Sequence, residues 1–182
     1  MKLLSTAAFV LAAGLSQASL AADFELRSNN LKLGQAIHAE HYWNNFGCSG
    51  DNVMPELHWK NVPAGTQSFA VTFYDETAPT GSGFWHWVVY DIPVTTTSLA
   101  GGVNGTALPT GAVEGNTDLG KPGFFGPCPP IGRKHNYVYT LHALKVAKLP
   151  VDAAASPALI GFMLWQNRIE KATLRVTAGP RK

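Results

Sequence analysis

Three segments in the middle and late parts of the chain alternate as β-strands do, and they constrain the fold more than any other feature. They are Gln67–Asp75, Phe84–Ile92 and Asn136–Lys145. Both faces of each segment are largely apolar, which is typical of strands covered by packed layers on both sides. The sequence therefore predicts a sheet whose central strands are buried on both faces.

Glycine and proline divide the chain between these segments. The 18 glycines and 12 prolines are densest at Pro79–Gly83 and Gly120–Gly132, which are expected to be turns and loops. Shorter strands are predicted at Phe24–Ser28, Glu56–Trp59 and Ala172–Thr177. Many turns between short strands exclude a helical bundle and predict an all-β fold.

One short helical segment is predicted near the C-terminus. Ser156 can cap it, and Pro157 takes the first helical position. Gly161 weakens this helix, and a break is expected near Trp165. The residues at helical spacing, with the last one a turn further on, are Leu159, Phe162, Met163, Gln166 and Ile169.

The N-terminus has the pattern of a secretory signal peptide. Lys2 supplies a positive charge, Leu3–Leu15 is apolar and uncharged, and Ser19–Ala21 offers small residues for cleavage after Ala21. The apolar run is too short for a stable membrane anchor, and no cysteine follows it to carry a lipid. We expect residues 1–21 to be removed and residues 22–182 to form one domain in the periplasm or outside the cell. Loss of Lys2 leaves 13 basic and 12 acidic side chains, a net charge of 13 − 12 = +1.

Cys48 and Cys128 are the only cysteines. In an oxidising compartment two thiols more often form one disulfide than remain free, so a Cys48–Cys128 bridge is predicted. The alternative is a pair of buried free thiols. The spacing is not C-x-x-C, so the bridge would be structural and would not cycle between redox states.

Charge and motifs exclude several classes of function. The net charge of the full chain is +2, which lacks the basic footprint of a nucleic-acid-binding protein. The motifs G-x-S-x-G, Walker A and H-E-x-x-H are absent. His38 and His41 are three residues apart, but a lone pair without a third ligand does not predict a metal site.

Polar side chains cluster where strands meet turns. Asp75 ends one predicted strand and His86 lies near the start of the next, so Asp75 is the expected partner of a buried His86. His135 and Tyr137 are two residues apart in the third strand and should point the same way.

Strict alternation predicts the faces of the second strand. It places Trp85 and Trp87 opposite His86, where both should pack in the core. On the side of His86 it places Phe84, Val88 and Tyr90.

Several blocks of sequence resemble the phosphatidylethanolamine-binding protein family, in its bacterial YbhB/YbcL (Raf kinase inhibitor-like) branch. They are Gly50–Asn52, Asp75–Pro79, Trp85–Pro93, Gly126–Pro130 and His135–Tyr137. The resemblance implies an antiparallel β-sandwich with a small anion pocket at one end. It assigns the ligand-binding positions to Asp75, His86, Pro130, His135 and Tyr137. The family's D-P-D-A-P motif is changed here at Glu76 and Thr77, so the loop lacks a proline that would stiffen it.

These residues can bind a phosphate or carboxylate group. Two imidazoles and a phenol can donate hydrogen bonds to an oxyanion, and Asp75 can orient a histidine or meet the amine of a zwitterion such as phosphoethanolamine. We expect a binding module for a small anionic or zwitterionic ligand, without a cofactor, that could also modulate a partner protein. The alternatives are a hydrolase or lyase using Asp75, His86 and His135, and a lipid carrier.

Overall fold

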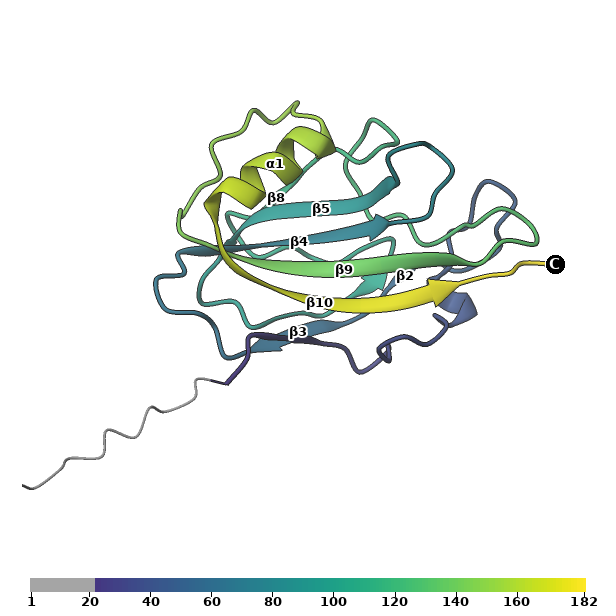
Figure 1. Ribbon diagram of the computed structural model, residues 1–182, viewed down its shortest axis with the longest axis horizontal. Helices are drawn as coiled ribbons and strands as arrows, with labels where there is room; N and C mark the ends of the chain where they lie inside the picture. Colours follow the sequence, from purple (N-terminus) through teal and green to yellow (C-terminus); the bar gives the residue numbers. More distant parts are fainter. Residues whose placement is uncertain (1–21) are drawn as a thin grey trace, which may run out of the picture.

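The computed structural model describes residues 22–182 and contains a five-stranded antiparallel sheet in the order β10-β9-β4-β5-β8 (Figure 1). The three strands predicted to be central, β4, β5 and β9, occupy the interior of this sheet, which confirms their assignment. The outer strand β10 begins four residues earlier than the predicted Ala172. The bounds are β4 Ser68–Asp75, β5 Phe84–Pro93, β8 Val113–Glu114, β9 His135–Leu144 and β10 Arg168–Ala178.

Smaller elements cover one face of the large sheet and complete a sandwich. A three-stranded sheet has the order β1-β3-β6, and β2 pairs with β7. Apolar side chains from both layers, such as Leu57 and Trp59 of β3 and Phe69 and Val71 of β4, form the main core between them. The elements are β1 Glu25–Arg27, the 3-10 turn η1 Ala39–His41, β2 Val53–Met54, β3 Leu57–Lys60, β6 Ser98–Leu99 and β7 Gly102–Val103.

The helix α1, Pro157–Asn167, covers the opposite face of the large sheet (Figure 1). As predicted, Ser156 caps it by accepting a hydrogen bond from the backbone N–H of Leu159 at 3.2 Å. The predicted break at Trp165 is wrong, because the helix continues to Asn167, and Ile169 belongs to β10.

Glycine in this helix serves close packing. A Cβ atom at Gly161 would lie 3.1 Å from the Trp85 ring, so the missing side chain lets α1 approach the sheet. Burial of Ile160 and Leu164 against Val88 then holds the helix in place. Among residues 22–182, no helix is long and apolar enough to cross a membrane.

The strand β5 contains a β-bulge at His86. Its neighbour β4 pairs Phe73 with Trp87 and Tyr74 with Trp85, so His86 is an extra residue on the bulged strand. Such a bulge interrupts the alternation of side chains and re-aims the residues within it.

The bulge changes which face each side chain of β5 occupies. His86 and Trp87 both lie on the side of the main core, where the His86 ring is 5.4 Å from that of Phe73. Trp85, Val88 and Tyr90 pack instead on the side of α1. The prediction that Trp87 lies opposite His86, with Val88 and Tyr90 beside His86, is therefore wrong. The assignment of Trp87 to the core is confirmed, since its exposed fraction is 0%.

The predicted signal peptide, residues 1–21, lies outside the described residues.

Candidate functional site

A cavity of about 190 Å³ opens at one end of the large sheet. β4 ends there at Asp75, and its neighbours β5 and β9 begin there at Phe84 and His135. Adjacent antiparallel strands run in opposite directions, so the end of one lies beside the starts of the other two. All five residues predicted to form the site line this cavity: Asp75, His86, Pro130, His135 and Tyr137.

Asp75 is buried and bonds His135 rather than the predicted His86. Its Oδ2 lies 2.7 Å from Nδ1 of His135, and its Oδ1 accepts hydrogen bonds from the backbone N–H and the hydroxyl of Thr77 at 2.9 and 3.1 Å. Both carboxylate oxygens thus have protein donors in contact, and the bond to His135 fixes the orientation of that ring. The expected Asp75–His86 pair is wrong because the bulge in β5 aims His86 at a different loop.

The two altered motif positions hold the loop by other means than proline. Thr77 bonds Asp75 and also accepts a hydrogen bond from the backbone N–H of Asn136 at 2.9 Å. Glu76 forms an ion pair with Arg175 of β10. The side chains of Glu76 and Thr77 therefore anchor this loop to β9 and β10.

His86 is held by the backbone of the loop after residue 123. Its Nδ1 lies 2.9 Å from the carbonyl oxygen of Phe125, which fixes the hydrogen on Nδ1. Burial lowers the pKa of His86 to about 4, so the ring is neutral at pH 7. The neutral ring then presents the lone pair of Nε2 as its remaining polar group.

Tyr137 supplies a phenol that remains protonated. Burial is the main cause that raises its pKa, and the nearby Asp75 carboxylate raises it further. Its hydroxyl therefore stays protonated, and can donate one hydrogen bond, over the whole physiological pH range.

Asn52 positions the loop that holds His86. Its Nδ2 donates to the carbonyl of Phe124 at 3.1 Å and its Oδ1 accepts from the N–H of Gly126 at 2.7 Å. A Cβ atom at Gly126 would lie 2.1 Å from the carbonyl oxygen of His41, so only glycine fits there. Spacing alone gave no sign of this role, although Asn52 belongs to one of the blocks that carry the family resemblance.

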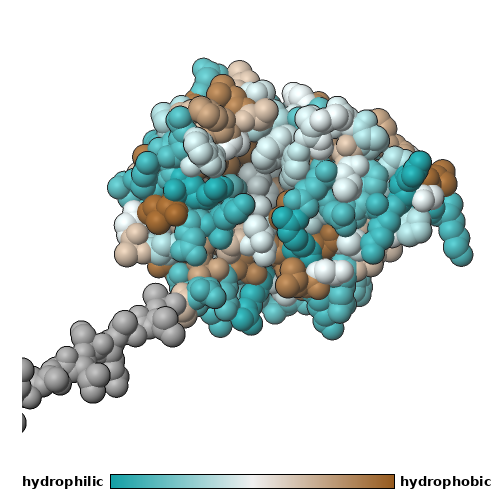
Figure 2. Space-filling model, in the orientation of Figure 1, coloured by the Kyte–Doolittle hydropathy of each residue, from teal (hydrophilic) through white to brown (hydrophobic). Residues whose placement is uncertain are grey.

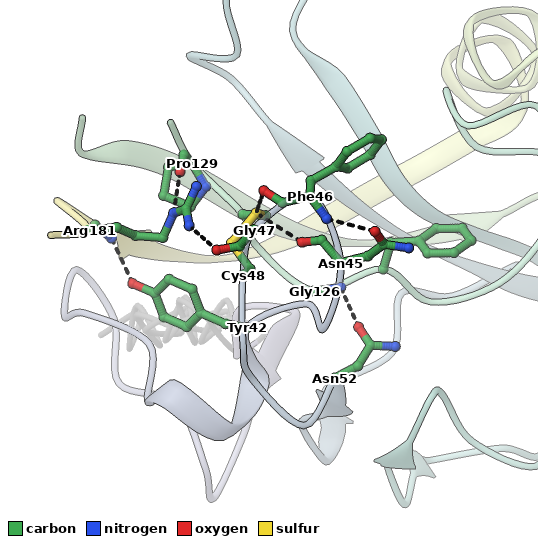
Figure 3. The surroundings of a disulfide bond; sticks show 12 residues. Tyr42, Asn45, Phe46, Gly47, Cys48, Asn52, Gly126, Pro129 and Arg181 are labelled. Atoms are coloured by element: carbon green, nitrogen blue, oxygen red, sulfur yellow. Dashed lines mark hydrogen bonds between the residues drawn. A yellow bond between two sulfur atoms is a disulfide. The ribbon is translucent and has the colours of Figure 1, made fainter. Parts of the chain in front are cut away.

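Aromatic rings form an apolar wall of the cavity, which sequence reasoning missed. Trp43 packs edge-on against Phe46 and Phe125, with ring centroids 4.9 and 5.4 Å apart. The Cys48–Cys128 disulfide, which confirms the predicted pairing, ties the segment of Trp43 and Phe46 to the loop that follows Phe125 (Figure 3).

Arg181 reinforces the same junction. Its guanidinium donates to the carbonyl oxygens of Gly47 and Pro129, each at 2.6 Å, and so joins both sides of the disulfide to the C-terminal segment (Figure 3).

Among residues 22–182, no lysine or arginine lines the cavity, but Arg133 and Lys134 lie at its rim and Lys121 lies over the ring of Phe125. Arg133 and Lys134 are exposed and border an adjoining hollow that shares Pro130 and His135 with the cavity. In the described part of the chain, no group of three His, Cys, Asp or Glu residues is placed to hold a metal. His41 is buried and its Nδ1 lies 2.7 Å from the carbonyl oxygen of Val53.

Comparison with known proteins agrees with this architecture. The family model of the phosphatidylethanolamine-binding protein matches residues 27–179. The UPF0098 protein YbcL of Escherichia coli is 51% identical over 158 residues, covering 85% of this chain and 86% of YbcL. The UPF0098 protein YbhB of the same bacterium is 43% identical over 152 residues, covering 82% and 96%.

Solved structures show the same fold. The crystal structure of E. coli YbcL, described as a new member of the mammalian PEBP family, superposes with a TM-score of 0.83 at 47% identity and covers 88% of this chain and all of that one. A PEBP homolog from Chlamydia trachomatis has a TM-score of 0.72 at 25% identity, covering 85% and 95%. This chain therefore belongs to the phosphatidylethanolamine-binding protein family, within its bacterial YbhB/YbcL branch.

Proposed function

We propose that residues 22–182 form a single periplasmic binding domain whose cavity takes a small oxyanion, such as a phosphate or the phosphate of phosphoethanolamine. The observation that carries this proposal is the convergence of His86, His135 and Tyr137 on one cavity, with Asp75 orienting His135 at 2.7 Å. The exposed Arg133 and Lys134 at the rim favour the approach of an anion.

Binding of an oxyanion should be coupled to a proton. The neutral His86 offers only a lone pair at Nε2, which repels a fully ionised oxygen but accepts a hydrogen bond from a protonated one. The complex therefore takes up a proton at His86 or selects the less charged form of the ligand, which is H2PO4⁻ for inorganic phosphate and the monoanion for a phosphate monoester. Either route makes binding tighter as pH falls from about 8 to 6, by at most about tenfold per pH unit for each proton.

The two alternatives have less support. For a hydrolase or lyase, the hydroxyls that line the cavity are Thr80, which bonds the carbonyl of Gly83, and Tyr137, whose pKa is raised, so neither is activated as a nucleophile. For a lipid carrier, a cavity of about 190 Å³ accommodates a headgroup but not acyl chains.

Calorimetric titration with phosphate and phosphoethanolamine tests the proposal. His86→Ala and His135→Ala should each abolish binding, while His58→Ala should retain it. His58 is a matched control because it pairs with Glu56 at 2.7 Å in the small sheet and does not line the cavity. Unchanged affinity in both cavity variants would refute the assignment of the binding site to this cavity. Affinity that weakens as pH falls would keep the site and refute the proton coupling.

The periplasmic location depends on processing of the N-terminus. Intact mass of the exported protein should show that it begins at about Ala22. A mass that retains residues 1–21 would refute the signal peptide.

A further inference from the structure

Four large apolar side chains lie exposed on one side of α1 and at the start of β10. Leu159, Phe162, Trp165 and Ile169, here called the α1 patch, are between 41% and 62% exposed. The rings of Phe162 and Trp165 stack with centroids 6.1 Å apart. In the space-filling view, hydrophobic atoms gather at the edge where Figure 1 places α1 (Figure 2). Of the ten large apolar residues exposed in the described chain, four therefore belong to this patch.

The core of the protein does not account for the α1 patch. The helix already buries Ile160 and Leu164 against the sheet. A surface helix ordinarily turns charged residues to solvent, yet the eleven residues of α1 include no charged side chain. An apolar outer face of this kind is typical of a surface that contacts another molecule or a membrane.

Basic residues surround the C-terminal end of the patch. Arg168 follows α1 directly, the backbone N–H of Lys145 donates to the carbonyl of Asn167 at 2.9 Å, and Lys171 lies two residues beyond Ile169. None of these three cations forms an ion pair within the described residues. Glu170 is the only acidic residue between 157 and 171.

We propose that the α1 patch docks on the surface of a lipid bilayer that contains anionic lipids. An uncharged helix with exposed tryptophan, phenylalanine and leucine, bordered by lysine and arginine, fits the boundary between headgroups and acyl chains. The aromatic side chains enter the boundary, while Lys145, Arg168 and Lys171 contact lipid phosphates.

A second copy of the chain fits this surface less well. A stable dimer buries roughly 800 Å² and about 20–30 residues on each partner, far more than four side chains offer. A two-fold contact would also bring the same cations of both copies together.

The docking surface and the cavity share no residues, because none of the four patch residues lines the cavity. The basic end of the patch is also distant from it, since Lys145 directly follows the end of β9, whereas His135 begins it, and ten residues of strand span roughly 33 Å. Cavity variants and patch variants can therefore be tested independently, and failure of either proposal leaves the other standing.

Sedimentation with vesicles tests the proposal on the purified exported protein. Vesicles of phosphatidylcholine with phosphatidylglycerol should bind it more tightly than phosphatidylcholine alone, and salt should weaken this binding. Trp165→Ser should lower the partition coefficient about tenfold or more. The double variant Lys145→Gln/Lys171→Gln should lower it about fivefold per cation.

Leu33→Ser is the matched control, because Leu33 is 69% exposed and lies between β1 and η1. It should bind vesicles as the unmodified protein does. Equal partitioning of the unmodified protein and Trp165→Ser would overturn the proposal. So would a concentration-dependent dimer in sedimentation velocity that Trp165→Ser abolishes, because the patch would then belong to a second copy.

Discussion

Replacing Asn52 should weaken both the fold and the ligand site, because this one amide holds the loop that orients His86. Asn52 is 3% exposed and has a positive φ of 53°. Its side chain makes three hydrogen bonds, with Phe124, Gly126 and the side chain of Asn104. Two of them satisfy buried backbone groups that water cannot reach after the amide is removed.

Comparison of two variants separates the hydrogen bonds from the backbone conformation. Asn52→Gly removes the three bonds and leaves the positive φ unstrained. It leaves two buried backbone groups unsatisfied and should cost about 2–6 kcal/mol of unfolding free energy, at about 1–3 kcal/mol per group. Asn52→Ala removes the same bonds and adds about 1–2 kcal/mol, since a Cβ atom disfavours this conformation.

Urea unfolding gives both free energies, provided that the slope with denaturant is the same in all three proteins. Phosphate titration of the same samples reports on the site, and both variants should bind more weakly because the Phe125 carbonyl no longer holds His86. If Asn52→Gly is within about 0.5 kcal/mol of the unmodified protein, the loop is held by other contacts and the reasoning fails.

Four further predictions concern stability. Burial lowers the pKa of His86 to about 4 and that of His142 to about 3. The two histidines therefore take up protons in the unfolded chain at a higher pH than in the folded protein, and stability should fall as pH drops from about 6.5 towards these values. Measurement of the melting temperature as a function of pH tests this. Within residues 22–182, neither ring nitrogen of His142 has a hydrogen-bond partner, so His142→Leu should raise stability by about 1–2 kcal/mol and flatten the acid loss. Lower stability at pH 7 would show that the imidazole is better accommodated than its contacts suggest. Trp87→Ala should cost about 3–5 kcal/mol by urea unfolding, whereas a cost below about 1 kcal/mol would mean that the ring is not part of the packed core. Reduction of the Cys48–Cys128 disulfide should lower the melting temperature without unfolding the domain, with a loss of about 4–5 kcal/mol expected from chain entropy for its separation of 80 residues; an unchanged melting temperature would contradict this.

The sequence alone was sufficient to predict the long strands and five of the residues that line the cavity. Strands β4, β5 and β9 are apolar on both faces. A strand that is covered on both faces needs apolar side chains on both, so this pattern can be recognised without knowing which elements cover it. The cap and first turn of α1 depend only on Ser156 and Pro157, which act locally. The site residues followed from motif blocks whose strand ends meet at one edge of an antiparallel sheet.

Only the tertiary structure decided which partner each site residue has. The bulge at His86 is a mismatch between two strands, so no periodicity within β5 reveals it, and it carries His86 away from Asp75 to the carbonyl of Phe125. The contacts of Asn52 with the loop at Gly126 join residues 74 positions apart. Alternation along a strand reports burial, whereas hydrogen-bond partners depend on how separate segments are brought together, and that is fixed by packing of the whole domain.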